Sequence, residues 1–282
     1  MSCADQWWLY ASVSQIGAKR LYCSIRRLVA PRVTSGCDQM SLAPVLFVHG
    51  MWADSAHWNR FRRRLARLGL DTHAVTLLGH DAPQDFSVLR HVGIDEYIVQ
   101  VQDEIAALGA APVLVGHSMG ALIAQKVAET TQLRCLVLLA PVAPHGIRAF
   151  TMSTALCAAA NVTDAVMQRP FVVPWRNARY GILNALSPRE QTVVYQSFLW
   201  ESGRALRQVV TGAVRVDERK VSCPVLVAVG SRDRATPAAV AQRIANKYDA
   251  EFHEYPECCH FLSASRAVID EVSGWIITKV RE

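Results

Sequence analysis

The 282-residue sequence predicts an α/β protein with a mostly parallel sheet that helices cover on both faces. From residue 41 onward, short continuous apolar runs alternate with segments whose apolar residues recur at helical spacing. Continuous apolar runs are typical of strands buried on both faces, and their alternation with helices is typical of parallel sheets. The chain is 51% hydrophobic and 19% charged, which excludes a disordered protein. No run reaches the roughly 18 apolar residues that a membrane-spanning helix needs.

The expected core begins with a strand at 44–48 that runs into the turn His49-Gly50. Ser55 and Gly69 can cap the two ends of the helix that follows. The other expected strands cover residues 72–78, 112–115, 133–140, 224–229 and 251–255. Further helices are expected at 94–108, 120–130, 237–248 and 263–280. Sites on such sheets lie at the carboxyl ends of the strands, so functional side chains are expected in the loops there.

Residues 145–221 break this alternation. Helical patterns within them cover 150–168, 187–200 and 201–214. An insertion of this size ahead of the expected strand at 224–229 predicts a helical cap over the strand ends. The core would then consist of residues 41–144 and 222–282. The large apolar side chains of the cap include Trp175 and Trp200; any one of them can be packing, but together they predict a substrate with an apolar portion.

Residues 1–40 form an N-terminal extension that does not fit the core pattern. Their apolar positions recur at helical spacing, so they could form an amphipathic helix. Such a helix could pack on the core, lie on a membrane surface or have no packing partner. Membrane association is expected only through this segment. Because Met40 directly precedes the first core strand, the natural start could also be Met40, and the extension would then be an artefact of gene prediction.

Cysteine usage and the N-terminus predict a reduced, cytoplasmic protein. The eight cysteines form no CxxC pair with metal-binding spacing. The N-terminus lacks the basic start, the continuous apolar core and the small-residue cleavage site of a secretory signal.

The chain carries a net charge of +6, and its densest basic run lies within the helix that follows the first strand. The run consists of Arg60, Arg62, Arg63, Arg64 and Arg67. The other face of this helix is apolar, with Phe61 and Leu65 among its residues. We interpret the arginines as a solvated helix face and not as a nucleic-acid site.

The strongest chemical signal is the segment Gly116-His117-Ser118-Met119-Gly120. It follows an apolar strand and opens a helix, which is the context of a nucleophile elbow. Such a turn is so sharp that its flanks must be small, which accounts for the glycines two residues on either side. The serine hydroxyl is then exposed above the sheet at a helix N-terminus, where the helix dipole favours developing negative charge. Ser118 is therefore the predicted nucleophile.

A second signal is His49-Gly50-Met51-Trp52, just after the first core strand. Acyl transfer needs two N–H donors directed at the developing oxyanion. We expect these donors to be the backbone N–H groups of Met119 and Met51. A plain strand-to-helix turn would also use a glycine, but the position of this segment ahead of the elbow favours an oxyanion hole. Trp52, like the tryptophans of the cap, is a candidate for the substrate pocket.

A serine nucleophile needs a base, and three histidines follow Ser118 in the sequence. His145 lies at the start of the cap, and His253 lies within the expected strand at 251–255. His260 lies in the loop between the last strand and the last helix. In serine hydrolases of this kind the chain order is serine, acid, histidine, and the base belongs in that loop. His260 is therefore the predicted base.

The acid that orients the base is expected at Asp233. Asp233 follows the expected strand at 224–229, at the end where a site should lie. The loop after the preceding strand, Ala140-Pro-Val-Ala-Pro, has no acid. The alternative reading of Asp233 is a turn or helix cap beside Thr236 and Pro237.

Together, GHSMG, HGMW, GSRDRATP and ECCHF resemble the α/β-hydrolase superfamily, in its capped esterase, lipase and C–C hydrolase branch. The resemblance covers about residues 41–282, with the four motifs in the family's order and spacing. It implies the α/β-hydrolase fold, the nucleophile, base and acid named above, and Met51 and Met119 as oxyanion donors. The elbow serine argues against the dehalogenase and epoxide hydrolase branches, which use an aspartate there. The β-hairpin with which such proteins usually begin is not clear in residues 1–40.

The predicted function is hydrolysis of a carboxylic ester or thioester of a small to medium apolar substrate through an acyl-enzyme intermediate. We expect no cofactor and no metal, because the sequence has no GxGxxG after a strand, no P-loop and no HExxH. The same residues would serve a thioesterase, an acyltransferase or cyclase of a biosynthetic pathway, or a C–C bond hydrolase. A non-catalytic ligand-binding protein could also keep this fold; such proteins can lose a member of the triad, whereas this sequence has all three.

Overall fold

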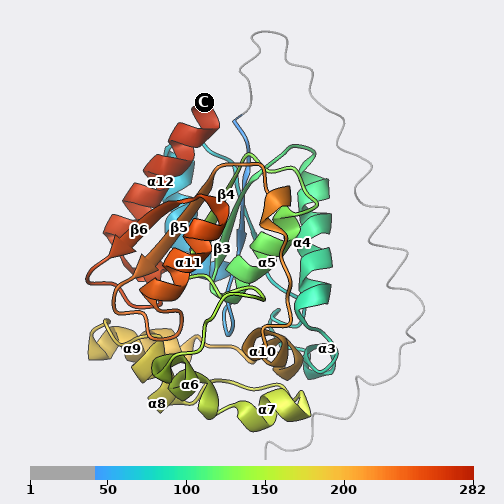
Figure 1. Ribbon diagram of the computed structural model, residues 1–282, viewed down its shortest axis with the longest axis vertical. Helices are drawn as coiled ribbons and strands as arrows, with labels where there is room; N and C mark the ends of the chain where they lie inside the picture. The colour runs from blue at the N-terminus through green and yellow to red at the C-terminus, as the bar shows by residue number, and fades with distance from the viewer. Residues whose placement is uncertain (1–41) are drawn as a thin grey trace, which may run out of the picture. The chain divides into compact units, whose positions relative to one another are not determined.

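Six strands form one parallel sheet in the computed structural model, which describes residues 42–282 (Figure 1). They are β1 (Val45–Val48), β2 (Thr72–Val75), β3 (Val113–His117), β4 (Cys135–Leu139), β5 (Val225–Gly230) and β6 (Glu251–Tyr255). Their order across the sheet is β2-β1-β3-β4-β5-β6, and every neighbouring pair is parallel. The predicted α/β class with a parallel sheet is therefore confirmed. The expectations for residues 1–40 lie outside the described residues.

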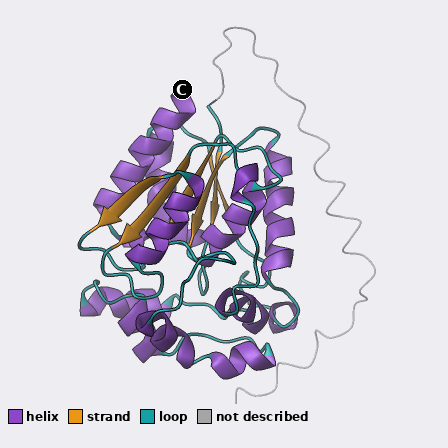
Figure 2. Ribbon diagram, viewed as in Figure 1, coloured by secondary structure: helices purple, strands orange, loops and turns teal. Residues whose placement is uncertain are grey.

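Helices cover both faces of the sheet (Figures 1 and 2). One face packs against α4 (Ile94–Leu108), α5 (Met119–Ala128) and α11 (Ala238–Tyr248). The other packs against α2 (Asn59–Arg67) and α12 (Arg266–Arg281). Alternate strand residues enter the two cores, so that Leu114 faces α5 while Val113 and Val115 face α2 and α12. Burial on both faces explains why β1, β4 and β5 are apolar without interruption, whereas the edge strands β2 and β6 contain polar residues.

Five helices lie between β4 and β5 in the sequence and are called the inserted helices below. They are α6 (Met152–Ala159), α7 (Val162–Met167), α8 (Trp175–Gly181), α9 (Pro188–Gln196) and α10 (Gly203–Val210). In Figures 1 and 2 the strand arrows point toward these helices, so the helices lie at the carboxyl ends of the strands. None of the helices in residues 42–282 is long and apolar enough to span a membrane.

The inserted helices differ in detail from the predicted ones. The helix expected at 150–168 is split into α6 and α7, because the chain leaves helical geometry at Asn161, whose side chain bonds to Asp164 instead of continuing the helix. No helix was predicted between those expected at 150–168 and 187–200, yet α8 begins directly after Pro174. Proline fits there because a helix start needs no N–H at that position.

Two further differences lie before α4. Strand β2 ends at Val75 and not at 78, because the N–H of Leu77 bonds to His49 Nε2 and the N–H of Leu78 bonds to Gln100 Oε1. These bonds turn the chain away from the sheet. A short helix, α3 (Phe86–Leu89), then lies between the strand expected at 72–78 and the helix expected at 94–108, where no helix was predicted. Asp85 accepts hydrogen bonds from its first N–H groups. The described residues also contain three short 3₁₀ helices: η2 (Ser55–Trp58), η3 (Glu218–Lys220) and η4 (Leu262–Ala264).

Candidate active site

Ser118 lies at the sharp turn between β3 and α5. Its backbone has φ 55° and ψ −118°, a left-handed conformation that a residue with a side chain rarely adopts. A Cβ on Gly116 would overlap the carbonyl oxygen of Gly120, so the two ends of the turn lie too close for a side chain at position 116. Among residues 42–282 the Ser118 hydroxyl makes no hydrogen bond, His260 included, and Ser118 is partly exposed. The turn has the geometry that the motif predicted.

The loop after β1 packs directly against this turn. A Cβ on Gly50 would lie 2.9 Å from Ser118 Cβ and 3.0 Å from the His117 carbonyl oxygen, so only glycine allows the approach. Met51, the first predicted oxyanion donor, follows Gly50. Met119, the second, is the first residue of α5, and the first N–H groups of a helix have no partner within it. Within the described chain neither of these two N–H groups bonds to a protein acceptor. The structure therefore leaves both predicted oxyanion donors unpaired beside Ser118.

Asp233 and His260 lie in contact, although 27 residues separate them. His260 Nδ1 is 2.8 Å from Asp233 Oδ2, and both residues are buried. Asp233 Oδ1 accepts hydrogen bonds from the N–H groups of Ala235 and Thr236, each at 2.8 Å, and the Thr236 hydroxyl lies 2.8 Å from Oδ2. The carboxylate is thus fixed by its own turn. It orients the His260 ring so that Nδ1 carries the proton and Nε2 is the basic nitrogen.

The other two histidines that follow Ser118 are engaged elsewhere. His145 is exposed, and its Nδ1 lies 3.0 Å from the Gly212 carbonyl oxygen. His253 lies between Glu251, at 2.7 Å, and Glu271, at 2.8 Å. Neither contacts Asp233. Within residues 42–282 no three His, Cys, Asp or Glu side chains are grouped so that they could hold a metal ion.

Two further histidines surround the base and were not predicted from the sequence. The buried His117 ring lies 2.9 Å, through Nε2, from the His260 carbonyl oxygen. His57 stacks on His117 with ring centres 5.0 Å apart and meets Phe261 edge-on at 5.1 Å. Burial, followed by repulsion from a protonated His260, lowers the pKa of His57 to about 4 and that of His117 well below its usual value. Both rings are therefore neutral at neutral pH and pack around His260 without adding charge.

The three predicted pocket tryptophans divide into two groups. Trp52 and Trp175 pack on one apolar cluster of the inserted helices, which also contacts Phe261, the residue after His260. Trp52 lies against Phe198 at 6.0 Å and has a left-handed backbone with φ 63°. Trp200 is not in this cluster; it is 42% exposed and packs edge-on against Phe86.

Glu201 joins the inserted helices to the core through a fully buried network that the sequence analysis missed. Its carboxylate lies 3.2 Å from His80 Nε2 and accepts hydrogen bonds from the Tyr97 hydroxyl, at 2.9 Å, and from the Ser202 N–H, at 2.7 Å. Burial lowers the pKa of His80, but the carboxylate and its hydrogen bond outweigh this, and the pKa is raised. His80 therefore keeps its proton to a higher pH than an ordinary histidine does.

The segment that Glu201 anchors also holds the loop after β1, which carries the predicted oxyanion donor Met51. The N–H of Leu199 donates to the carbonyl of Trp52 at 2.9 Å, directly after Met51. Gln84 pairs with both the N–H and the carbonyl of Trp200, at 2.8 and 2.9 Å. The segment from Leu199 to Glu201 is thus tied on each side, and it fixes the peptide next to a predicted oxyanion donor.

The first prediction concerns His57. The unfolded chain binds a proton at this residue near pH 6.5, whereas the folded chain does so near pH 4, so its contribution to stability is complete above pH 6.5 and is lost as the pH falls toward 4. In His57→Gln the free energy of unfolding, measured with urea, should depend less on pH in this window, by up to about 1.4 kcal/mol per pH unit. The exposed residue His91 provides the control variant, His91→Gln. Equal pH dependence in all three proteins would contradict the assignment.

The second prediction concerns Glu201. Glu201→Gln removes the carboxylate and leaves the protonated His80 buried without its counter-charge, so the free energy of unfolding should fall by about 3–5 kcal/mol at pH 6. Urea unfolding followed by circular dichroism measures the loss. Glu282→Gln removes a carboxylate from an exposed pair with Lys279 and should cost less than about 1 kcal/mol. Similar losses in the two variants would show that the network is not a main anchor.

Comparison with known proteins supports the fold and the family. The model of the alpha/beta hydrolase family matches residues 45–271. No curated protein sequence matches significantly.

Several solved structures share the fold at low sequence identity. An extracellular alpha/beta-hydrolase from a Paenibacillus species is 18% identical, with a TM-score of 0.66 over 85% of this chain and 100% of that one. A thermophilic esterase from Thermogutta terrifontis is 20% identical, with a TM-score of 0.64 over 84% and 90%. A thioesterase domain from the curacin biosynthetic pathway is 17% identical, with a TM-score of 0.57 over 84% and 91%. With most of its length matched by the family model, this chain belongs to the alpha/beta hydrolase family.

Proposed function

We propose that this chain is a serine hydrolase that cleaves a carboxylic ester or thioester of an apolar substrate. The observation that carries the proposal is the 2.8 Å contact between the buried side chains of His260 and Asp233. These residues lie in the loops after β6 and β5, at the end of the sheet where Ser118 occupies its strained turn. A buried acid that holds one nitrogen of a histidine leaves the other nitrogen to act as a base. A merely structural pair would not need an unbonded serine beside two unpaired N–H groups.

In the proposed mechanism His260 Nε2 removes the proton of Ser118, and Ser118 Oγ attacks the carbonyl carbon. The N–H groups of Met51 and Met119 donate to the oxyanion that forms. His260 then passes the proton to the leaving alcohol or thiol, which gives an acyl-enzyme. Water attacks this intermediate with His260 again as base, and the acid is released. Asp233 holds the ring and stabilises its charged form throughout.

The apolar part of the substrate is proposed to lie under the inserted helices, which act as a cap. The cluster around Trp52 and Trp175 supports this proposal, because it is apolar and reaches Phe261, the neighbour of the base. The esterase and the thioesterase domain among the similar structures agree with either an oxygen or a sulfur leaving group. Acyl transfer to another acceptor, cyclisation and C–C bond hydrolysis would use the same residues, and analysis of the products distinguishes them.

The third prediction is that Ser118→Ala lowers kcat/KM for p-nitrophenyl esters by at least about 10⁴-fold, because no other group can form the acyl-enzyme. Activity is measured with esters of rising chain length, whose profile reports the size of the apolar site. Ser231→Ala is the matched control, since this serine is exposed and its hydroxyl, within residues 42–282, donates only to Glu254. The control should stay within about twofold of the wild type. Undiminished turnover in folded Ser118→Ala would overturn the proposal.

A further inference from the structure

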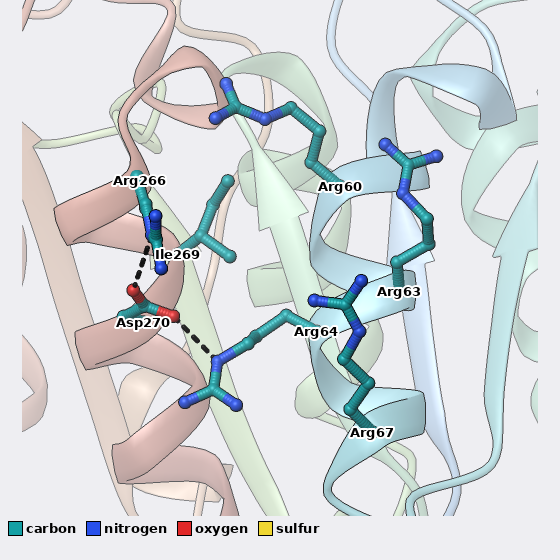
Figure 3. Close-up of a pocket in the computed structure, with 7 residues that line it drawn as sticks. All are labelled: Arg60, Arg63, Arg64, Arg67, Arg266, Ile269 and Asp270. Carbon is teal, nitrogen blue, oxygen red and sulfur yellow. Dashed lines mark hydrogen bonds and ion pairs between the residues drawn. The ribbon is translucent and has the colours of Figure 1, made fainter.

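A groove lined mainly by arginine runs between α2 and α12 (Figure 3). The lining residues are Arg60, Arg63, Arg64 and Arg67 from α2 and Arg266, Ile269 and Asp270 from α12. The α2 arginines recur at spacings of three and four residues, which places them on one stripe of the helix. The groove has a volume of about 470 Å³, and the buried Ile269 forms part of its wall. It lies on the side of the sheet that α2 and α12 cover and contains none of the predicted catalytic residues.

Positive charge dominates the groove. Asp270 is the one acidic lining residue, and it lies between Arg64, at 2.7 Å, and Arg266, at 3.5 Å, as Figure 3 shows. Five guanidinium groups against one carboxylate leave a net charge of +4 in the lining. Within the described part of the chain, Arg63 and Arg67 form no ion pair.

Packing within the protein does not account for this charge. Like charges three or four residues apart destabilise a helix, so the stripe costs stability. The apolar contact between α2 and the core is already made by Phe61 and Leu65, which are fully buried, so the arginine stems are not needed to cover it. Arg266 adds a fifth positive group from a second helix. Positively charged side chains from two helices thus face one groove at a cost in stability, which indicates a ligand of negative charge.

We propose that this groove binds a small molecule that carries a di- or triphosphate group. Guanidinium groups are planar forks that bind phosphate oxygens in pairs, and they hold their charge at any physiological pH. With a rise of about 1.5 Å per residue, the stripe from Arg60 to Arg67 extends about 10 Å, enough for more than one phosphate. The volume lies in the usual range of small-molecule sites, roughly 300–1,000 Å³, which favours such a ligand over an extended nucleic acid.

The site extends to the segment that follows the predicted base. Arg60 donates hydrogen bonds to the carbonyl oxygens of Ser263 and Ala264, close after His260 in the sequence. These bonds position the Arg60 guanidinium at one end of the groove. Because they use only part of the guanidinium, its other N–H donors remain for a ligand. Binding there does not depend on Ser118, so the inference stands apart from the proposed hydrolysis.

The test is isothermal titration of the full chain with sodium diphosphate and, in a second arm, with ATP in the absence of magnesium. The salt is held at about 150 mM, where interactions between distant surface charges are largely screened. The groove variant is Arg63→Gln/Arg67→Gln. The charge-matched control is Arg219→Gln/Lys220→Gln, which changes exposed residues of η3, outside the groove.

We expect saturable binding at one site in the wild type and equally in Ser118→Ala. The groove variant should bind at least about tenfold more weakly, and the control should change less than about twofold. Tighter binding of diphosphate indicates the free anion as the ligand, and tighter binding of ATP indicates a nucleotide; both results support the site.

Three results would overturn the proposal. No saturable binding of either probe would show that the arginines are a solvated face. Equal weakening in the two double variants would show general charge attraction. Binding of a short DNA duplex that depends on Arg63 and Arg67, and with which diphosphate does not compete, would assign the groove to a nucleic acid. Circular dichroism of each variant confirms that the fold is retained.

Discussion

The left-handed backbone of Ser118 is the constraint on which the rest of the site depends. A serine does not adopt φ 55° unless its surroundings impose that conformation. Here the N–H of Ser118 donates to the Leu139 carbonyl at 2.9 Å, and its own carbonyl accepts from the Val142 N–H at 3.2 Å. Both partners belong to the neighbouring strand or to the loop after it. The core that orders β3, β4 and α5 therefore supplies the free energy that holds the strained turn.

The other parts of the site reach Ser118 because the sheet is parallel. Strands β1, β3, β5 and β6 end at the same edge, so loops far apart in the sequence meet there. The loop with Gly50 closes on the turn within van der Waals distance, and the loops with Asp233 and His260 form their contact nearby. The inserted helices complete this end through Glu201, whose buried carboxylate joins them to His80 and Tyr97. A charge buried this deeply is tolerated only when every oxygen is paired, which makes the anchor specific.

Much of this arrangement could be predicted because its signals are local. The elbow motif lies within five consecutive residues. Helix α4 was predicted from its apolar residues at helical spacing, with the bounds that the structure shows, 94–108. The order of strands and motifs then led to Asp233 and His260 by position. The fold class was confirmed, whereas the catalytic roles stay predictions that the geometry supports.

The rest could not be predicted, because it depends on contacts between distant parts of the chain. No local pattern pairs His80 with Glu201, 121 residues away, or brings His57 against His117. The shortening of β2 has the same origin, since a side chain of the preceding loop takes the N–H that would have extended the strand. The arginines of α2 could be predicted as one helix face, but only the packing of α12 turns that face into a groove with Arg266 on its other side.

The most direct measurement of the central claim is peptide mapping by mass spectrometry after the folded protein has reacted with a fluorophosphonate. Such probes modify a serine only when a neighbouring base activates it and N–H donors stabilise the charge on the adduct. The account predicts a single adduct, on the peptide that contains Ser118, and no adduct in protein unfolded before the reaction. An adduct on another residue, or an unmodified Ser118 in folded protein, would contradict it.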